Sequence, residues 1–441
     1  MNPAVPAPPA ARRDAVHWRE LSPRQLKSGL AAWLGWLFDG LDMHLYTLVA
    51  LPLVMELVHA TSRSDPAVQE KSAYIQAAFL AGWAIGGGFF GRLGDLLGRS
   101  RALVLTILTY ALCTGLCAFA ATWWQLLILR FFAALGIGGE WAVGASLLVE
   151  TWPRAWRPWI AAALQTAVNL GVLVAATVVG LMATLPHPPP TRTVFLVGVL
   201  PALFVFWVRR QVPEPEVWEQ AEHASAAKPG IRALFRGPVA LATLRVSLVC
   251  ALSLSAWWLF LFWHPQHLRR LLADGGLPPA AITQRISAAF FVMIAVSVFG
   301  NFVAGWIAKR AGNRRAIQVM FLGMFAAMVG AFVVPRGFSE LAWFWVPLVG
   351  FFSGVFGLFT MYLPPLFPTL LRTTGSGFCY NIGRLAAAVA SVIFGWTAPV
   401  DNSRIALLFT SLLALAAMIC AFGLPDDSAE LQAADEFALR I

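Results

Sequence analysis

Two acidic residues lie in an otherwise apolar segment, LGWLFDGLDMHLY, near the start of the chain. Asp39 and Asp42 are three residues apart, which on an α-helix places them about 60° apart on one face, with Tyr46 near the same line. If this segment crosses a membrane, each charge costs about 2.5 to 3.5 kcal/mol at the helix centre, so the acids indicate a functional site that faces a central cavity. Two carboxylates side by side in a low dielectric tend to hold a proton. His44 lies about 140° from Asp39, and we expect it to face a neighbouring helix.

A second apolar segment, LRFFAALGIGGEWAV, carries Arg130 and Glu140 on either side of small residues that allow close helix approach. Counted at about 1.5 Å per residue, both lie within roughly 9 Å of the midplane, at depths that let them meet Asp39 and Asp42. We expect the three acids to bind and release a coupling proton, with Arg130 as the partner that favours release. The alternative is a permanent buried ion cluster that holds the two helices together.

The second half of the chain has one intramembrane charge, Arg384, in FPTLLRTTGSGFCYNIGRL. A guanidinium grips a carboxylate in bidentate fashion, and Tyr380 and Asn381 supply hydrogen bonds nearby, so this segment is a candidate site for a substrate anion. Pairing of Arg384 with a backbone carbonyl or with another helix is the alternative. Gln165 and Asn169, at i and i+4, are further candidates for substrate contact or for helix-to-helix hydrogen bonds.

Composition places these segments in a membrane. The 441 residues are 59% hydrophobic and 12% charged, which is more apolar surface than a soluble protein of this size can hide. The apolar runs are too long and continuous for barrel strands, so the spans must be helices. The net charge of +10 is dispersed between the runs, which argues against nucleic-acid binding. The five cysteines lie in apolar runs without CxxC spacing, so we expect no metal site, no disulfide framework and no cofactor besides the proton.

The apolar runs predict an all-α membrane protein of twelve transmembrane helices in two six-helix bundles. We expect a disordered cytoplasmic tail at 1–29, the first bundle at 30–208, a cytoplasmic linker at 209–245, the second bundle at 246–423 and a cytoplasmic tail at 424–441. The predicted spans are 30–57, 73–92, 102–120, 123–148, 159–184, 193–208, 246–263, 286–308, 316–334, 341–363, 377–399 and 405–423.

Basic residues set the orientation of these spans. With both termini in the cytoplasm, the inside segments hold 22 of the 32 Lys and Arg residues and the outside loops hold 8. Positive charge accumulates on the cytoplasmic side of membrane proteins, which favours this orientation. The N-terminal segment also lacks the short apolar core and the cleavage site of a signal peptide.

The two halves repeat one motif. The segment after the second run reads GRLGDLLGRSR, and the segment after the eighth reads GWIAKRAGNRR, 214 residues later. Repetition at matching places in the topology indicates two related bundles. The matching residues are Gly91 and Gly305, Gly98 and Gly312, and Arg101 and Arg315.

GRLGDLLGRSR resembles the G-x-x-x-D-x-x-G-R-x-R loop signature of the major facilitator superfamily. The resemblance implies that the two bundles rock around a site near the midplane, and that Asp95 clamps the cytoplasmic side while the transporter faces outward. Lys309 stands where the second copy would have its acid, so we expect an asymmetric clamp. The other residues implied in this gate are Gly91, Gly98, Arg99, Arg101, Gly305, Gly312 and Arg315.

Three segments are similar to the metabolite:proton symporter branch of that superfamily: D-G-x-D around Asp39, GIGGEW around Glu140, and the segment that ends at Arg384. Members of the branch carry sialate, lactate and pyruvate, aromatic acids or citrate-like acids. The resemblance implies a monomeric inner-membrane symporter for a small carboxylate anion. Pro365 departs from the branch, which often has an acid there, and this puts any gating contact from that position in doubt.

Other functions are disfavoured by the same residues. A passive facilitator or anion exchanger gains nothing from two acids in its cavity, and a non-transporting sensor has no need of Asp95 and the acids of the first span. No phosphate-binding loop, nucleophile elbow or metal-spaced histidine cluster is present to support an enzyme. The sequence leaves open which organic acid is carried.

Overall fold

The structure, a computed structural model, describes residues 18–61, 65–183, 190–224, 229–397 and 403–425. In these ranges the chain folds into helices and forms no β-strand. The first half contains η1 (Trp18–Glu20), α1 (Pro23–Leu57), α2 (Pro66–Leu97), α3 (Arg99–Cys117), α4 (Trp123–Thr151), η2 (Arg154–Trp156), α5 (Arg157–Ala183), η3 (Thr191–Val199) and α6 (Leu200–Gln211).

The connection between the halves carries α7 (Glu216–Ala224) and η4 (Ile231–Phe235), and the second half follows. The predicted linker therefore contains a helix of its own, and the seventh span begins before residue 246. The remaining elements are α8 (Gly237–Asp274), α9 (Pro279–Ala311), α10 (Asn313–Phe332), α11 (Phe338–Glu340), the π-helical η5 (Leu341–Trp345), α12 (Val346–Phe352), α13 (Val355–Tyr362), η6 (Pro364–Leu366), η7 (Thr369–Leu371), α14 (Arg372–Thr397), α15 (Ser403–Cys420) and η8 (Ala421–Gly423).

Each predicted span is mostly helical in the residues that the structure describes, but the third and ninth end earlier than predicted, at Cys117 and Phe332, and the tenth is interrupted by a turn at residues 353–354. In the described residues nine helical stretches are long and apolar enough to cross a membrane, judged by length and composition. The other three predicted spans are α1, which carries Asp39 and Asp42, α14, which carries Arg384, and a shorter apolar stretch, Thr191–Val205. Large apolar side chains such as Phe119, Leu203 and Phe299 are more than 60% exposed, as expected for a surface that faces lipid.

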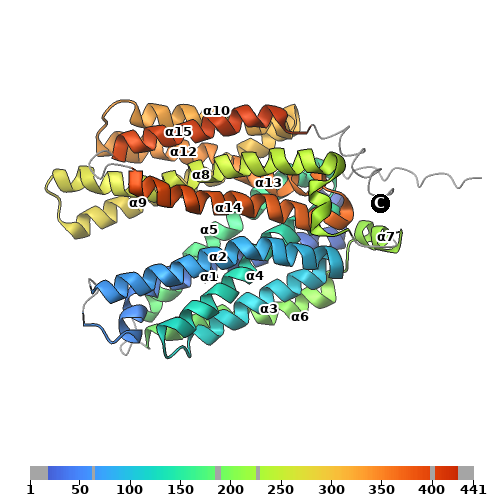
Figure 1. The fold of residues 1–441 in the computed structure, drawn as a ribbon, viewed down its shortest axis with the longest axis horizontal. Coiled ribbons are helices and arrows are strands. Elements are labelled where there is room, and N and C mark those ends of the chain that lie inside the picture. Colours follow the sequence, from blue (N-terminus) through green and yellow to red (C-terminus); the bar gives the residue numbers. More distant parts are fainter. Residues whose placement is uncertain (1–17, 62–64, 184–189, 225–228, 398–402, 426–441) are drawn as a thin grey trace, which may run out of the picture.

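The helices form two pseudo-symmetric bundles, which confirms the predicted fold class. Figure 1 shows α1 to α6 in the lower bundle, α8 to α15 in the upper one, and α7 at one end of the molecule. Between the bundles, α14 packs against α2 and α4, and α5 packs against α9 and α13. The end at which α7 lies is called the gate end below.

The first helix begins earlier than predicted. Ser22 caps α1, because its hydroxyl accepts from the Gln25 N–H while the Gln25 side chain accepts from the Ser22 N–H, and Pro23 occupies the first turn. The predicted disordered tail is therefore wrong for residues 23–29, which are helical. Residues 1–17 and 426–441, which hold most of the two predicted tails, lie outside the described residues.

The repeated motif is a helix end and not the predicted loop. Residues 91–97 form the last turns of α2, Gly98 is a one-residue break with φ 101°, and α3 starts at Arg99. Gly312 makes the same break between α9 and α10 with φ 87°. Glycine adopts this left-handed conformation without the penalty that a Cβ brings. The two copies thus share one backbone geometry at positions 214 residues apart.

Candidate functional site

Asp39 of α1 and Glu140 of α4 form a buried acid pair inside the first bundle. Asp39 is 8% exposed and Glu140 is fully buried. The Glu140 carboxyl reaches α1 at Gly35, where it fills the space that a Cβ would take. The two carboxyls lie beside each other and beside the Tyr110 hydroxyl of α3. Asp39 Oδ1 and both Glu140 carboxyl oxygens are buried and accept no hydrogen bond from any described residue.

Asp42 has a different environment one turn along the same helix. Its carboxylate accepts from Arg130 Nη1 at 3.2 and 3.4 Å and from the Thr114 hydroxyl of α3. The Arg130 guanidinium lies against the rings of Tyr46 and Phe79, with its central carbon 5.0 and 4.7 Å from their centroids. Asp42 is therefore neutralised and hydrogen-bonded within the bundle.

The four residues predicted as one proton site thus separate into two groups. The structure joins Asp42 to Arg130 and places Asp39 beside Glu140, whereas the sequence treats both aspartates as one pair on a cavity-facing surface. His44 Nδ1 lies 2.9 Å from the Gly40 carbonyl oxygen of its own helix. This hydrogen bond of His44 therefore stays within α1.

Arg384 of α14 lies at the boundary between the two bundles. Its guanidinium carbon is 4.1 Å from the ring centroid of Trp83 on α2 and 4.8 Å from that of Tyr380 on its own helix. Arg384 Nη1 donates to Asn381 Oδ1 at 2.8 Å, and Asn381 Nδ2 donates to the Gly377 carbonyl at 2.8 Å. The structure thus brings the three predicted residues of this segment together. The side chain is half-buried, and it interacts electrostatically with Asp39.

Gln165 and Asn169 lie on α5, which packs against α1, α9 and α13. Both side chains are half-buried, and neither makes a hydrogen bond with the part of the chain that the structure describes. The structure places them on a helix at the boundary between the bundles, and their contact with substrate stays a prediction.

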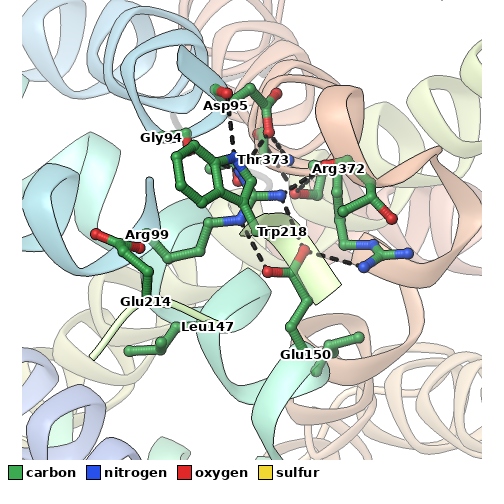
Figure 2. A network of polar contacts seen from close by, with 12 residues as sticks. Gly94, Asp95, Arg99, Leu147, Glu150, Glu214, Trp218, Arg372 and Thr373 are labelled. Carbon is green, nitrogen blue, oxygen red and sulfur yellow. Dashed lines mark hydrogen bonds and ion pairs between the residues drawn. The ribbon is translucent and has the colours of Figure 1, made fainter. Parts of the chain in front are cut away.

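Asp95 is the centre of a fully buried polar cluster at the gate end (Figure 2). Its carboxylate accepts from the backbone N–H groups of Thr373 and Thr374 at 3.2 and 2.8 Å and from the Thr374 hydroxyl at 2.5 Å. These two threonines lie in the first turn of α14, and a helix N-terminus with free N–H groups favours a carboxylate. Arg99 Nη1 also donates to Asp95 at 3.0 Å. Asp95 therefore ties the first bundle to the second.

Glu150, at the end of α4, connects two arginines of different bundles. Arg99 donates to it in bidentate fashion at 2.8 and 2.9 Å, and Arg372 of α14 donates to it at 2.9 Å. Arg99 Nη2 also donates to the Thr369 carbonyl at 2.6 Å. Charge-assisted bidentate contacts are stronger than neutral hydrogen bonds. We call Asp95, Arg99, Glu150 and Arg372 the gate cluster.

The connection between the bundles reaches into this cluster (Figure 2). Trp218 of α7 is 3% exposed, and its ring nitrogen donates to the Asp95 carbonyl at 3.2 Å. Glu214 accepts from the first N–H groups of α3, those of Ser100 and Arg101, at 3.0 Å each. Partial burial raises the pKa of Glu214, and these hydrogen bonds oppose the rise. The Arg101 side chain itself is exposed.

The second copy of the motif has different surroundings. Lys309 and Arg315 are exposed, and a Cβ on Gly312 would meet no described atom within 4 Å. Gly91 and Gly305 lie where helices of different bundles approach closely, since a Cβ on either would come within 2.8 Å of a carbonyl oxygen of the opposite bundle. The structure is consistent with the asymmetry that Lys309 suggests.

Several residues of these sites escape sequence reasoning. Glu150 and Arg372 lie at the ends of apolar runs, where charges usually contact solvent, and Trp218 lies in a polar segment. The one sequence feature that points to these contacts is Trp218, a tryptophan in the otherwise polar segment between the bundles. Tyr110 and Thr114 are ordinary residues of an apolar run, and only their contacts with the acids single them out.

Comparisons with known proteins identify the family and agree with the fold. A family model described as Major Facilitator Superfamily matches residues 32–370. The chain is 31% identical over 382 residues to the "Probable 4-methylmuconolactone transporter" of Cupriavidus pinatubonensis, which covers 85% of this chain and 84% of the relative. It is 27% identical over 417 residues to "Sialic acid transporter NanX" of Escherichia coli, covering 93% and 97%. The solved proton:xylose symporter XylE superposes with a TM-score of 0.73 at 17% identity, covering 93% of this chain and 98% of that one.

Proposed function

The chain belongs to the Major Facilitator Superfamily and is a multi-pass membrane transporter, not an enzyme, and we propose that it carries a small organic carboxylate anion by proton symport with alternating access. The sequence relatives named above are a muconolactone and a sialic acid transporter, which supports an organic anion as substrate. The proton coupling and the roles of individual residues rest on the geometry of the site.

One observation carries the coupling. Asp39 and Glu140 are buried side by side, their oxygens lack hydrogen-bond donors among the described residues, and Asp39 interacts electrostatically with Arg384. A buried carboxylate pair that makes no salt bridge is stabilised when the pair holds a proton. We assign the coupling proton to this acid pair, and we assign Asp42 and Arg130 to a permanent ion pair that orients α1 against α4.

Arg384 links the proton to the substrate. An ionised Asp39 attracts the guanidinium, and a substrate carboxylate competes for the same charge. Protonation of the acid pair removes that competition, so proton binding raises substrate affinity, and by reciprocity substrate binding favours the proton. Release of the proton restores the attraction of Asp39 for Arg384 and favours release of the substrate.

The gate cluster supplies the alternating access. It joins α2 and α4 of one bundle to α14 of the other, so the two bundles cannot separate at the gate end while it is intact. We place this end in the cytoplasm of the cell, because the basic residues concentrate there, and we place the protein in the inner membrane as a monomer. The cluster then holds an outward-facing or occluded state.

Uptake into liposomes tests the proposal. Purified protein is reconstituted, and uptake of labelled carboxylic acids is measured with and without an inside-alkaline pH gradient. We expect the gradient to raise the initial rate severalfold for the wild type and to have no effect in Asp39→Asn or Glu140→Gln. Asp274→Asn, a change at an exposed acid at the end of α8, is the matched control and should keep the response.

Two results would contradict the proposal. Wild-type uptake that ignores the gradient would identify an uncoupled facilitator or an exchanger. Binding of carboxylates without any uptake would identify a sensor that keeps the transporter fold.

A further inference from the structure

Tyr110 of α3 lies where the backbones of α3 and α4 are in contact. A Cβ on Gly136 of α4 would come within 2.8 Å of the Thr106 carbonyl oxygen and within 2.9 Å of the Tyr110 backbone nitrogen. Only glycine allows two helices to approach this closely. Glu140 follows Gly136 by one turn of α4, so the acid pair that Glu140 forms with Asp39 is one helical turn away from this contact.

The direction of the side chain takes the Tyr110 hydroxyl toward the acid pair. Helix α3 begins at the gate end and α4 ends there, so Glu140 lies on the gate-end side of Gly136. Side chains on an α-helix lean toward the N-terminus of the helix. Tyr110 therefore leans toward the gate end, and its hydroxyl lies beside the Glu140 carboxyl.

Helix α3 presents two hydroxyls to the acids, one turn apart. The Thr114 hydroxyl donates to Asp42, and Tyr110, four residues earlier, lies beside the acid pair. Residues at i and i+4 share one face of a helix. A single face of α3 thus supplies one hydroxyl to each of the two groups of acids that the structure separates.

The Tyr110 hydroxyl and the acid pair complement each other. Tyr110 is fully buried, and its hydroxyl makes no hydrogen bond with any described residue. Asp39 Oδ1 and both Glu140 oxygens are buried acceptors that lack a donor among the same residues. A buried polar group without a partner is costly. A bond between the hydroxyl and the pair is strongest when the carboxyl is charged, because charge-assisted hydrogen bonds are about twice as strong as neutral ones.

We infer that Tyr110 is the hydrogen-bond donor that sets the pH at which the acid pair takes up and releases its proton. When the pair loses the proton to water, the Tyr110 hydroxyl donates to the Glu140 carboxylate. When the pair takes up a proton again, this bond weakens, and the phenol keeps its own proton throughout. Tyr110 is thus a positioning residue. This inference rests on the proposed function, because it concerns the regulation of the same proton site.

Other ionisable side chains surround the same site. Those that interact with Asp39, or that lie beside Asp42, are Asp42 on α1, Cys113 and Cys117 on α3, Arg130 on α4 and Arg384 on α14. The described parts of α2, α5 and α6 carry charged side chains only near their ends. All these groups stay in place when Tyr110 is changed, so a difference between Tyr110 variants reports on its hydroxyl.

Infrared spectroscopy tests the inference in the purified transporter. The C=O stretching band of protonated carboxyl groups is titrated over pH, and the part that belongs to the acid pair is identified by its loss in Glu140→Gln. A hydrogen bond donated to a carboxylate favours the ionised form, so its removal favours the protonated form. We expect Tyr110→Phe to move the midpoint of this titration to higher pH by about one unit. The pH optimum of gradient-driven uptake should move in the same direction.

A second change at the same position should have the opposite effect. A ring-fluorinated tyrosine at position 110 has nearly the same size and is a stronger donor, so the midpoint should fall below that of the wild type. Tyr74→Phe removes the hydroxyl of an exposed tyrosine on α2 and is the matched control, which should keep the wild-type midpoint. The unfolding temperature of each variant shows whether it is folded, and the fluorinated form decides if Tyr110→Phe is not.

The outcomes separate this inference from the proposed function. A midpoint that stays unchanged or falls in folded Tyr110→Phe, or that does not fall with the fluorinated tyrosine, would overturn the role of Tyr110 and leave proton symport standing. A wild type in which the acid pair gives no titrating band would also overturn it. If wild-type uptake ignores the pH gradient as well, the proposed function fails with it.

Discussion

Asp39 and Asp42 differ in their partners although three positions separate them in the chain. Asp42 has a guanidinium and a hydroxyl, whereas Asp39 has another acid as its neighbour. A residue's helix and depth follow from the sequence, but its neighbours depend on the rotation of each helix in the bundle. The sequence therefore identifies the two acids, but it does not predict that Asp42 pairs with Arg130 while Asp39 lies beside Glu140.

Substitution by asparagine should affect stability at Asp42 and not at Asp39. Asp42→Asn leaves the buried Arg130 without its counter-charge, and breaking one side of a buried ion pair destabilises a protein by about 3 to 5 kcal/mol. Asp39→Asn removes a carboxylate that repels Glu140, so the unfolding temperature in detergent should not fall. Thermal unfolding followed by tryptophan fluorescence measures both. An unchanged unfolding temperature in Asp42→Asn would show that the pair does not stabilise α1 against α4.

A second prediction concerns the space that Gly35 leaves for Glu140. Gly35→Ala places a methyl group where the Glu140 carboxyl lies, so the acid pair is displaced. We expect the pH gradient to lose its effect on uptake. Gly144→Ala is the control, because the atoms nearest its added Cβ are 3.7 Å away, at ordinary contact distance. Gradient-driven uptake that survives Gly35→Ala would place the coupling proton elsewhere.

At the scale of elements, the breaks between α2 and α3 and between α9 and α10 have one backbone shape and different surroundings. A Cβ on Gly98 would lie 2.5 Å from the Glu214 carboxyl carbon, whereas Gly312 faces open space. The repeat in the sequence predicts the common shape. The difference arises because the chain between the bundles covers only the first copy.

Alanine at these two glycines measures that difference. Both substitutions strain a left-handed backbone by about 1 to 3 kcal/mol. Gly98→Ala also displaces Glu214 from the start of α3, so we expect it to lower the unfolding temperature more than Gly312→Ala does. Equal losses in the two variants would mean that Glu214 contributes nothing to the gate end.

The gate cluster allows a comparison between the same position in the two halves. Asp95→Asn places an amide against three donors of Thr373 and Thr374, so the gate end should open more often. Lys309→Gln, at the matching exposed position, should have no effect. The readout is the alkylation rate of a cysteine introduced at buried Ser376, with the native cysteines replaced. Equal rates in wild type and Asp95→Asn would show that Asp95 does not hold the gate.

At the scale of the whole molecule, much of the architecture could be predicted and little of the interface. Lengths of apolar runs determine the number of helices, and the motif repeated after 214 residues indicates two related bundles. The contacts between bundles, such as Glu150 with Arg372 and Trp83 with Arg384, join residues far apart in the chain. No local pattern encodes such pairs, because they depend on how the finished bundles meet.

The arrangement of the two bundles also divides the chemistry. The first bundle holds the acid pair, and the second provides the Arg384 guanidinium, so in the proposed mechanism proton and substrate meet only at the boundary between the bundles. Under this proposal transport and coupling share one rearrangement, because separation of the bundles would break the contact of Arg384 with Trp83 on α2.

The most direct test is to follow protons while the substrate moves. Liposomes that contain the transporter and a pH-sensitive dye are prepared without a pH gradient, and benzoate, or another acid that the uptake screen identifies, is added outside. Empty liposomes correct for passive entry of the neutral acid. We predict that the wild type acidifies the lumen in step with labelled substrate uptake, and that Asp39→Asn abolishes this acidification. Protein-dependent uptake without acidification would contradict proton symport.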